Sequence, residues 1–474
     1  MHEENASVVD NSKALKAGAW YVVSSIIVKA IAVISTPIFT RLMSTEEYGT
    51  SATFVSWYSL LLTFCTLNLT YSIGRAKLDY PDSIDKYIGS MQLLSGIVTA
   101  SIILLASFFI KPLAALLELN IPLTVLLMLY LLFTPAINFV QNGYRYRYKY
   151  KQNIAIAWYI SISTVLLSIV LILFVPGDKS ILRGIGIVAP NCVLSLYLWI
   201  KALNRKQISA NKEFWKYGLS LSAPLILHTV SMNILSQSDR IFIAKLCGNS
   251  DVGIYSLVYS YGILISVITN AVSDGWLPWF HDNYYIGNYK AIKQNSKKIV
   301  VLGCFMGLAC VALAPEAIYI LGGSKYMDGL PCVLPVVLGI VCQYIYTHYV
   351  NIEMHLKKTK YVSYGTMFAA SLNIVLNAIF ISKYGFVAAA YTTLASYLAL
   401  MVVHFLITRK ILKIKLYSDI FMFGSLVVTA AVSVILVFTY ELSLLRYVLI
   451  AIGFAVFVFL YRDFIIGFIK KRMN

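Results

Sequence analysis

The chain has 474 residues, of which 59% are hydrophobic and only 13% are charged. A soluble globular protein carries about a quarter charged residues, so this composition excludes an ordinary soluble domain and indicates a membrane protein. The formal net charge of +18 would suggest nucleic-acid binding in a soluble protein. In a membrane protein, basic cytoplasmic loops account for it, and we expect no nucleic-acid partner.

Apolar runs of about 18–25 residues recur along the chain, and each is long enough to cross a bilayer as a helix. No cleavable signal peptide is visible, because the polar segment 1–16 leads directly into a full-length span. We predict an all-α integral membrane protein with fourteen spans, at 18–40, 50–73, 88–110, 121–143, 154–175, 184–203, 217–237, 252–273, 299–321, 331–350, 361–381, 386–407, 419–439 and 446–461.

The basic residues show how these spans are oriented. The loops that follow even-numbered spans, together with both tails, hold most of the 39 Lys and Arg residues. Because cytoplasmic loops are enriched in Lys and Arg, this distribution predicts that both termini are cytoplasmic.

The chain also contains an internal repeat. The stretch 38–49, IFTRLMSTEEYG, has a longer relative at 238–262, SDRIFIAKLCGNSDVGIYSLVYSYG. In each, a basic residue is followed by an acidic turn and then by glycine. Two further pairs of segments are related at about the same distance, and they are 15–18 with 215–218 and 148–151 with 356–360.

The repeat predicts two lobes of six spans each, at 1–208 and 209–415. Since six is even, both lobes enter the membrane from the same side, and their pseudo-two-fold axis runs along the membrane normal. Residues 416–474 hold spans 13 and 14 and a cytoplasmic tail, outside the repeat.

Lys29 is the sharpest functional signal. It lies near the middle of the first span, about 16 Å from either end by helical rise. A Lys at this depth costs about 2.5–3.5 kcal/mol on insertion scales, so we expect it to face a wet or paired site. The alternative is that it forms an interhelical hydrogen bond or reaches toward the membrane surface.

Polar stripes also follow spans 2, 7 and 8, and they include Asn233, Tyr255, Tyr259 and Asn270. Polar residues inside membranes often hold helices together, and we interpret Asn373 and Asn377 in that way. The concentration of stripes on symmetry-related spans favours a shared cavity between the lobes.

The sign of the charge indicates the substrate class. Four basic residues lie at or above mid-membrane, whereas no carboxylate is expected near the centre of a span. A cavity of this kind would attract phosphate or carboxylate groups. The predicted substrate-binding residues are Lys29, Arg41, Arg240, Lys245, Asn233, Tyr255, Tyr259 and Asn270.

No enzyme constellation stands out, and we predict no catalytic residue, metal or cofactor. The six His residues are scattered, and the seven Cys residues lie mostly in apolar runs at spacings that match no metal site. No phosphate-binding loop for ATP is present, so energy would come from a gradient or from substrate supply and removal.

Three segments resemble a known family: 238–262, 36–49 (TPIFTRLMSTEEYG) and 357–397 (KKTKYVSYGTMFAASLNIVLNAIFISKYGFVAAAYTTLASY). They are similar to Wzx-type polysaccharide repeat-unit flippases. These belong to the polysaccharide transporter branch of the multidrug/oligosaccharidyl-lipid/polysaccharide exporter superfamily. The resemblance covers nearly the whole chain. It is specific to the branch but not to a sugar.

The resemblance implies two six-helix bundles with two extra helices, in the bacterial plasma membrane. It implies that undecaprenyl-pyrophosphate-linked oligosaccharides move to the outer leaflet by alternating access, for O-antigen (lipopolysaccharide) or capsule synthesis. A polymerase and a chain-length regulator of the same pathway are the expected partners. The alternatives are a flippase for the peptidoglycan lipid precursor or another lipid-linked polymer, a membrane polysaccharide polymerase, and a cation-coupled drug exporter, which would need a buried carboxylate.

Overall fold

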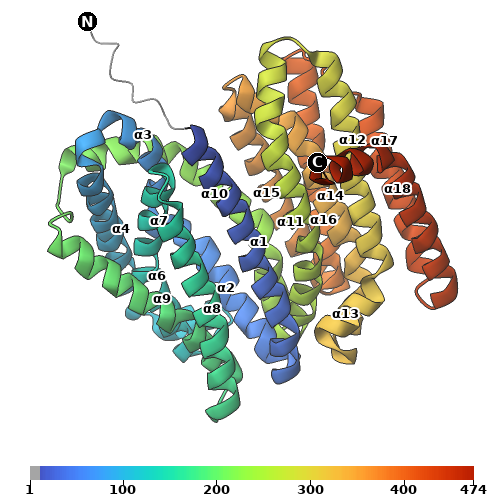
Figure 1. The fold of residues 1–474 in the computed structure, drawn as a ribbon. Coiled ribbons are helices and arrows are strands. Elements are labelled where there is room, and N and C mark those ends of the chain that lie inside the picture. The colour runs from blue at the N-terminus through green and yellow to red at the C-terminus, as the bar shows by residue number, and fades with distance from the viewer. Residues whose placement is uncertain (1–10, 474) are drawn as a thin grey trace, which may run out of the picture. The chain divides into compact units, whose positions relative to one another are not determined.

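The computed structural model describes residues 11–473 and, within them, every side chain from residue 20 to residue 459. Residues 1–10 of the predicted cytoplasmic N-terminal tail, the side chains of 15–17 in one repeat segment, and residue 474 lie outside the described residues. All regular elements in the described range are helices (Figure 1). The predicted all-α fold is therefore confirmed.

The predicted spans correspond to helices. In the described part of the chain, twelve helices are long and apolar enough to cross a membrane, or thirteen if the bent pair Thr45–Thr66 and Leu69–Asp79 is one span. A shorter apolar helix, Ser443–Phe459, stands where the fourteenth span was predicted. Each predicted span thus has a helix at its position in the described chain.

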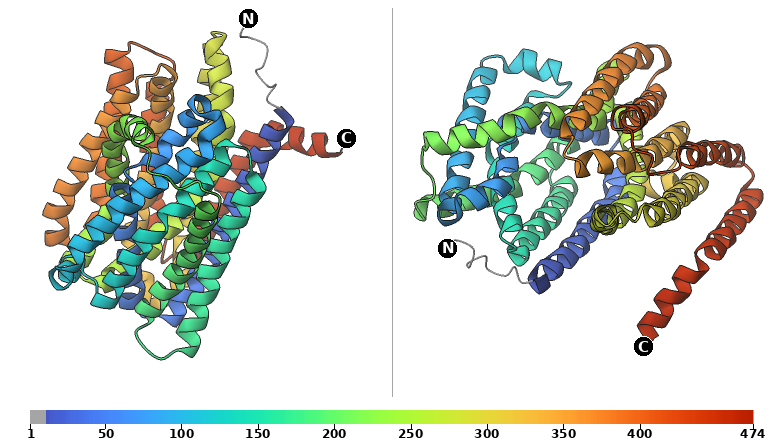
Figure 2. Two further views of the ribbon diagram at one scale, coloured as in Figure 1. Left: turned by 90° about the vertical axis from the view of Figure 1, so that its left-hand side faces the viewer. Right: turned by 90° about the horizontal axis from the view of Figure 1, so that it is seen from above.

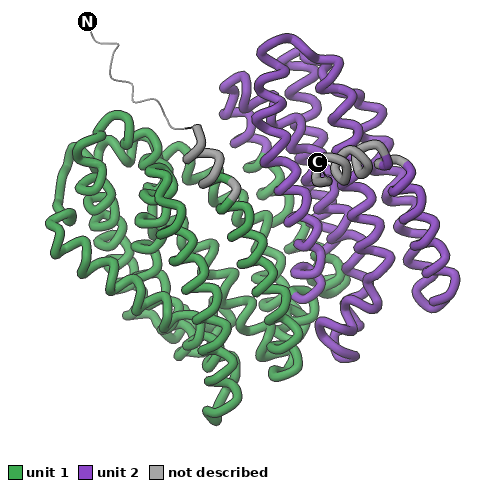
Figure 3. The backbone as a smooth tube through the Cα atoms, in the orientation of Figure 1, with its two compact units in different colours: residues 1–256, 366–389 green, residues 257–365, 390–474 purple. Residues whose placement is uncertain are grey.

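The chain packs as two compact units, Met1–Ser256 with Thr366–Ala389, and Leu257–Gly365 with Ala390–Asn474 (Figure 3). These boundaries differ from those of the predicted lobes, because α10 (Lys212–Leu246) packs along α2 (Thr45–Thr66) inside the first unit. The way helices pack into compact units does not show whether the two halves of the chain are related by a repeat. The predicted lobe boundaries at residues 208 and 415 therefore stay a prediction.

The first unit is a bundle in which α1 lies along α8 and α8 lies along α9 (Figure 1, Figure 2). It also contains α2, α10, the start of α11 (Asn249–Tyr285) and most of α15 (Thr359–Tyr384). Its other elements are α1 (Asn11–Leu42), η1 (Leu69–Ser72), α3 (Ile73–Asp79), η2 (Pro81–Ser83), α4 (Ile84–Ser107), α5 (Ile110–Leu116), α6 (Ile121–Phe133), α7 (Pro135–Tyr146), α8 (Tyr150–Phe174) and α9 (Lys179–Asn204).

The second unit holds the rest of α11 and the helices of the C-terminal part. Within it, α12 packs against α14 and α17. Its elements are α12 (Tyr289–Ala312), α13 (Ala314–Gly322), η3 (Ser324–Gly329), α14 (Leu330–His355), α16 (Val387–Leu406), η4 (Ile407–Ile411), α17 (Asp419–Phe438) and α18 (Ser443–Met473).

Three predicted spans are interrupted. Leu67 and Asn68 both have positive φ, of 48° and 54°, and the chain bends by 56° between the two helices that they separate. The spans at 121–143 and 299–321 each break next to a proline, at Pro135 and Pro315. Proline cannot donate the helical hydrogen bond and displaces the preceding turn, which explains both breaks.

Several helices of the first unit begin at well-formed caps. Ser44 and Glu47 form a reciprocal capping box at the start of α2, with Glu47 N donating to Ser44 Oγ at 3.1 Å and Ser44 N donating to Glu47 Oε2 at 2.7 Å. Asn120 caps α6 by accepting a hydrogen bond from Leu123 N at 2.9 Å, and Asp178 caps α9 by accepting one from Ser180 N at 2.8 Å. These side chains satisfy backbone N–H groups that have no partner inside the helix.

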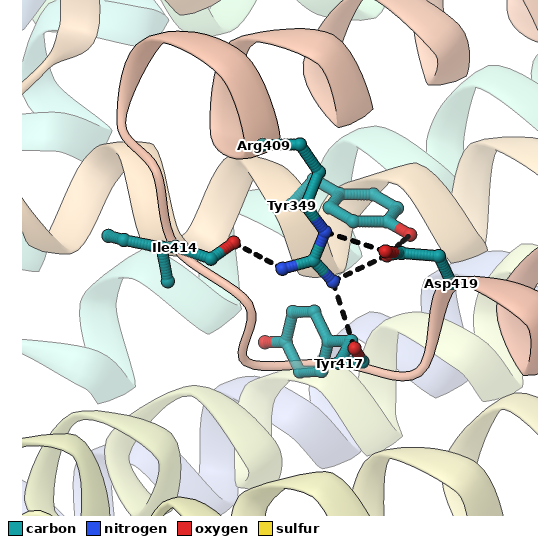
Figure 4. A network of polar contacts seen from close by, with 5 residues as sticks. All are labelled: Tyr349, Arg409, Ile414, Tyr417 and Asp419. Carbon is teal, nitrogen blue, oxygen red and sulfur yellow. Dashed lines mark hydrogen bonds and ion pairs between the residues drawn. The ribbon is translucent and has the colours of Figure 1, made fainter.

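In the second unit, Arg409 fixes the connection between α16 and α17 (Figure 4). Its Nε donates to Asp419 Oδ2 at 2.7 Å, and its Nη2 donates to Asp419 Oδ1 and to the Tyr417 carbonyl. Tyr349 OH donates to the same carboxylate at 3.1 Å. This two-donor ion pair ties α17 to α14 and to the end of α16.

Candidate functional site

Lys29 lies near the middle of α1, and its side chain is half-buried. Among the described residues it makes no hydrogen bond and no ion pair. By contrast, Thr36 and Thr40, further along α1, donate to carbonyls of their own helix at 2.9 and 3.1 Å. The described part of the chain therefore shows no partner that offsets the cost of a cation at this depth.

The same face of α1 carries a second unsatisfied group. Tyr21 is two helical turns from Lys29, and its buried hydroxyl has no hydrogen-bond partner in the described structure. Between these two residues, Ser24 anchors α1 by accepting a hydrogen bond from Trp158 Nε1 of α8 at 3.1 Å. The polar face of α1 thus combines one anchoring contact with two groups that need a partner.

The two related stretches of sequence meet inside the first unit, where α2 and α11 begin. We call this contact, around Gly49 and Gly253, the joint. A Cβ atom on Gly49 would lie 1.7 Å from the Asn249 carbonyl oxygen, and a Cβ on Gly253 would lie 2.1 Å from the Thr45 carbonyl oxygen. Thr45 Oγ1 and Ser250 Oγ are also 2.8 Å apart. The contact is reciprocal, as expected if the two stretches are related by a two-fold axis, and only glycine fits at its centre.

Further along α2, its polar side chains form hydrogen bonds with polar side chains of α10. Asn233 Nδ2 donates to the Ser59 carbonyl at 3.1 Å and to Thr63 Oγ1 at 2.9 Å. Asn68 Nδ2 donates to Thr229 Oγ1 at 3.1 Å. Asn233 therefore holds two membrane helices together in this structure.

A buried polar network surrounds Asp239, which is 1% exposed. Asn377 Nδ2 donates to Asp239 Oδ1 at 2.9 Å, and Tyr255 OH donates to Asp239 Oδ2. Ser238 Oγ donates to Asn373 Oδ1 at 2.6 Å, which is also within reach of Asn377 Nδ2, at 3.1 Å. These contacts join α10, α11 and α15 through one carboxylate.

Arg240 extends the network toward α2. It is 8% exposed, its Nε donates to Ser256 Oγ at 3.0 Å, and its Nη1 donates to the Ser236 carbonyl at 3.0 Å. Gln237 Oε1 accepts from Arg240 Nη1 at 3.4 Å and from Ser56 Oγ at 3.0 Å. Arg240 and Tyr255 are thus bound within the protein, and with Asp239 ionised the network carries no net formal charge.

The remaining predicted site residues occupy separate places. Arg41 is exposed in the last turn of α1, where its Nη1 lies 3.5 Å from the Pro37 carbonyl oxygen. Lys245 is exposed in the last turn of α10. Tyr259 is half-buried and Asn270 is exposed, both on the part of α11 that belongs to the second unit.

An acidic cavity of about 590 Å³ lies near the joint. Glu46, Glu47, Glu118 and Asp178 line it, at the point where α2, α6, α9 and α11 begin. Carboxylates are stabilised by helix N-termini, which explains their concentration here. They do not form a metal site, since the described residues contain no group of three or more His, Cys, Asp or Glu that could hold an ion.

Comparison with known proteins places the chain in a family. A family model described as "Polysaccharide biosynthesis protein" matches residues 14–283. The chain belongs to this polysaccharide biosynthesis family. A protein from the Lsg locus of Haemophilus influenzae is 23% identical over 297 residues, which cover 61% of this chain and 69% of that protein. The predicted resemblance to polysaccharide transporters is confirmed at the level of the family.

Solved structures show that the chain shares its fold with known membrane transporters. It is similar to the lipid II flippase MurJ in an inward closed conformation, with a TM-score of 0.70, 15% identity and coverage of 94% of this chain and 99% of that one. It is also similar to an inward-facing multidrug resistance transporter of the MATE family, with a TM-score of 0.63, 14% identity and coverage of 81% and 94%.

The sequence did not reveal two buried carboxylates. Asp239 is 1% exposed and Glu353 is fully buried, with its Oε1 2.9 Å from His404 Nδ1. Both lie beyond the ends of the predicted spans, at 217–237 and 331–350, and not at a span centre. The predicted seventh span ends at residue 237, whereas α10 continues to Leu246 and so carries Asp239 into the bundle. The lack of a buried carboxylate therefore no longer speaks against a cation-coupled exporter.

Sequence reasoning also missed a histidine pair in the second unit. His281 lies beyond the predicted eighth span, which ends at residue 273, but α11 continues to Tyr285, and His281 Nδ1 lies 2.7 Å from His355 Nδ1 of α14. The two rings are stacked, with their centroids 4.9 Å apart. No motif links residues this far apart in sequence. The aromatic run around Trp279 was the one signal that the helix continues.

Proposed function

We propose that this protein is a flippase for undecaprenyl-pyrophosphate-linked oligosaccharide repeat units. It moves them by alternating access from the cytoplasmic to the outer leaflet of the bacterial plasma membrane, with both termini in the cytoplasm. The product supplies synthesis of O-antigen or capsular polysaccharide. Membership of the polysaccharide biosynthesis family and the transporter fold support this proposal.

The observation that carries it is the unpartnered Lys29 on a membrane-spanning helix. A half-buried cation at mid-span, without a partner among the described residues, is expected where the substrate supplies the anion, and a pyrophosphate does so. Tyr21, on the same face, offers a hydroxyl that can bind a phosphate or sugar oxygen. Arg41 and Lys245 are exposed cations that we propose as further contacts for the anionic head group.

The other predicted site residues contribute differently to the proposal. Arg240, Asn233 and Tyr255 hold helices together in the first unit, so we assign them a positioning role for the substrate path. Tyr259 and Asn270, on α11 of the second unit, remain proposed sugar contacts.

A second candidate substrate is the lipid-linked peptidoglycan precursor. The observation that favours it is the likeness to the lipid II flippase MurJ, which extends over 94% of this chain. The two candidates share a polyprenyl pyrophosphate and differ in the attached group.

The deciding experiment uses a deletion strain that carries plasmid-borne variants. We expect lipid-linked repeat units to accumulate on the inner leaflet of the deletion strain while cell-wall synthesis continues. Lys29→Met should fail to restore polysaccharide output, Lys29→Arg should restore part of it, and Lys151→Met should restore it fully, because Lys151 is an exposed Lys at the start of α8. Normal output from Lys29→Met at normal protein level would refute the role of Lys29, and a cell-wall defect would favour the second candidate.

A further inference from the structure

A second, smaller cavity in the first unit has the opposite charge to the acidic one. It has a volume of about 250 Å³ and lies where α7 and α9 end and α4 and α8 begin. Its charged lining residues are Asp85, Arg147, Lys149, Lys201 and Arg205. We call it the basic cavity, and no residue of the predicted substrate-binding set lines it.

Most of the positive charge in the basic cavity is not neutralised by the protein. Arg147 forms an ion pair with Asp85, with Nη1 and Oδ1 2.5 Å apart. Among the described residues, Lys149, Lys201 and Arg205 have no carboxylate and no side-chain hydrogen-bond acceptor. Lys201 Nζ lies 5.7 Å from the centre of the Tyr197 ring, which is its one contact with a charged or aromatic group among the described residues. The cavity is thus lined by three cations that have no carboxylate partner.

A buried hydrogen-bond donor also lines the cavity without a partner. Gln92 of α4 is 2% exposed, and its Nε2 makes no hydrogen bond in the described structure. Buried amide groups nearly always have a partner, so an unsatisfied one at a cavity wall indicates a ligand or ordered water. Close packing fixes this wall, because a Cβ on Gly89 would lie 2.2 Å from the Gln207 carbonyl oxygen.

A simpler reading is that the cations only neutralise the C-terminal ends of α7 and α9. Arg147 does so, because its Nε donates to the Gly143 carbonyl at 2.9 Å. Lys149, Lys201 and Arg205 make no such bond to a helix carbonyl in the described structure. The orphaned Gln92 amide is not explained by this reading either.

We infer that the basic cavity binds a phosphate-bearing anion, with Lys201 and Arg205 as its cations and Gln92 as its buried donor. Under the predicted topology the cavity lies at the cytoplasmic end of the bundle. Basic pockets between membrane helices on that side are suited to anionic lipid head groups. A soluble phosphate compound has the same chemistry, and the experiment separates the two sources. The inference does not depend on the proposed transport function.

The test measures binding to the full-length protein purified in detergent. Native mass spectrometry gives the bound fraction across a titration with phosphatidylglycerol, and phosphatidylcholine serves as the uncharged-lipid control. A parallel arm uses inorganic phosphate, read as a thermal shift and as competition with phosphatidylglycerol. The variants are Lys201→Gln with Arg205→Gln, the matched control Lys151→Gln with Lys206→Gln, and Gln92→Met.

We expect phosphatidylglycerol to bind in preference to phosphatidylcholine. Each Lys or Arg near an anionic lipid contributes a factor of about five, so loss of Lys201 and Arg205 should weaken binding roughly 30-fold. The Lys151 and Lys206 control removes the same charge from exposed positions that do not line the cavity, and it should change binding by a few-fold at most. Gln92→Met keeps all charges and should weaken binding about tenfold, the loss of one hydrogen bond to a charged group.

Each other outcome has a defined meaning. If inorganic phosphate binds with the same dependence on Lys201, Arg205 and Gln92, and phosphatidylglycerol shows no preference, the ligand is a soluble phosphate compound. Equal losses in the two double variants would overturn the inference, as would the absence of binding of either probe to the wild-type protein. If the Lys201 and Arg205 variant does not fold, Gln92→Met alone decides, and unchanged binding by it refutes the site.

Discussion

The contact between Gly49 and Gly253 predicts a strong and specific effect of a single methyl group. In Gly49→Ala, the new Cβ would lie 1.7 Å from the Asn249 carbonyl oxygen and 2.8 Å from its carbonyl carbon. These are backbone atoms, so no side-chain rotation can relieve the clash. The 1.7 Å distance is shorter than an ordinary carbon–oxygen contact by more than about 1 Å. The starts of α2 and α11 must therefore move apart by roughly that amount.

This separation would break more than the glycine contact. The hydrogen bond between Thr45 Oγ1 and Ser250 Oγ, at 2.8 Å, and the one from Thr53 Oγ1 to Asn249 Oδ1, at 2.9 Å, both cross the joint. Two hydrogen bonds at about 1 kcal/mol each, with about 1–3 kcal/mol for overpacking, give an expected destabilisation of roughly 3–5 kcal/mol. Better helix propensity of Ala would offset about 1 kcal/mol of this at most.

The assay is the thermal unfolding of detergent-purified protein, with Gly275→Ala as the matched control. Gly275 is on the same helix as Gly253, and a Cβ there would meet no atom within 4 Å. Gly275→Ala should leave the unfolding temperature unchanged or slightly raised, while Gly49→Ala and Gly253→Ala should each lower it by several degrees. Equal unfolding temperatures for Gly49→Ala and Gly275→Ala would refute the reasoning.

Three further substitutions test the polar contacts, again by thermal unfolding. Asp239→Leu leaves the Asn377 amide and the Tyr255 hydroxyl without their acceptor and should cost about 2–5 kcal/mol, whereas an unchanged unfolding temperature would contradict the network. Arg409→Gln removes a two-donor ion pair and should cost about 3 kcal/mol, while Lys410→Gln at the neighbouring exposed position should cost nothing measurable. Asn233→Ala should lower stability by about 1 kcal/mol, and transport should fall in proportion. A complete loss of transport at unchanged stability would instead make Asn233 a substrate contact.

The sequence was sufficient to place the membrane helices, because apolar length is a local property. It was not sufficient for their ends. The predicted eighth span stops at residue 273, but α11 runs to Tyr285 through Pro278. A proline usually ends a helical pattern in sequence, and only the surrounding aromatic packing, such as Trp276 against Phe280, shows that this helix continues.

The residues of the candidate site also differ in how well their roles could be predicted from sequence. The cost of a cation in a membrane depends on the residue and its depth, so Lys29 could be singled out from sequence. The hydrogen-bond partners of Arg240 and Asn233 could not be predicted from sequence, because hydrogen bonds between helices depend on tertiary packing. The repeat identified Gly49 and Gly253 as equivalent positions, yet their mutual contact follows from the fold and not from either segment alone.

Asp239 and Lys29 differ in the partners that the protein gives them, and this difference supports a functional role for Lys29. Both are ionisable residues on membrane helices, and both would be costly alone. The Asn377 amide and the Tyr255 hydroxyl both donate to the Asp239 carboxylate, which is how buried charges are stabilised inside folds. Lys29 receives no such partner from the described residues. If Lys29 served stability, its replacement by Met would destabilise the protein. Because no described residue pairs with Lys29, we expect Lys29→Met to be neutral or stabilising, and we infer that the residue is kept for an anion that arrives from outside the protein. A substitution that stabilises the protein and abolishes transport would be the combined signature of that role.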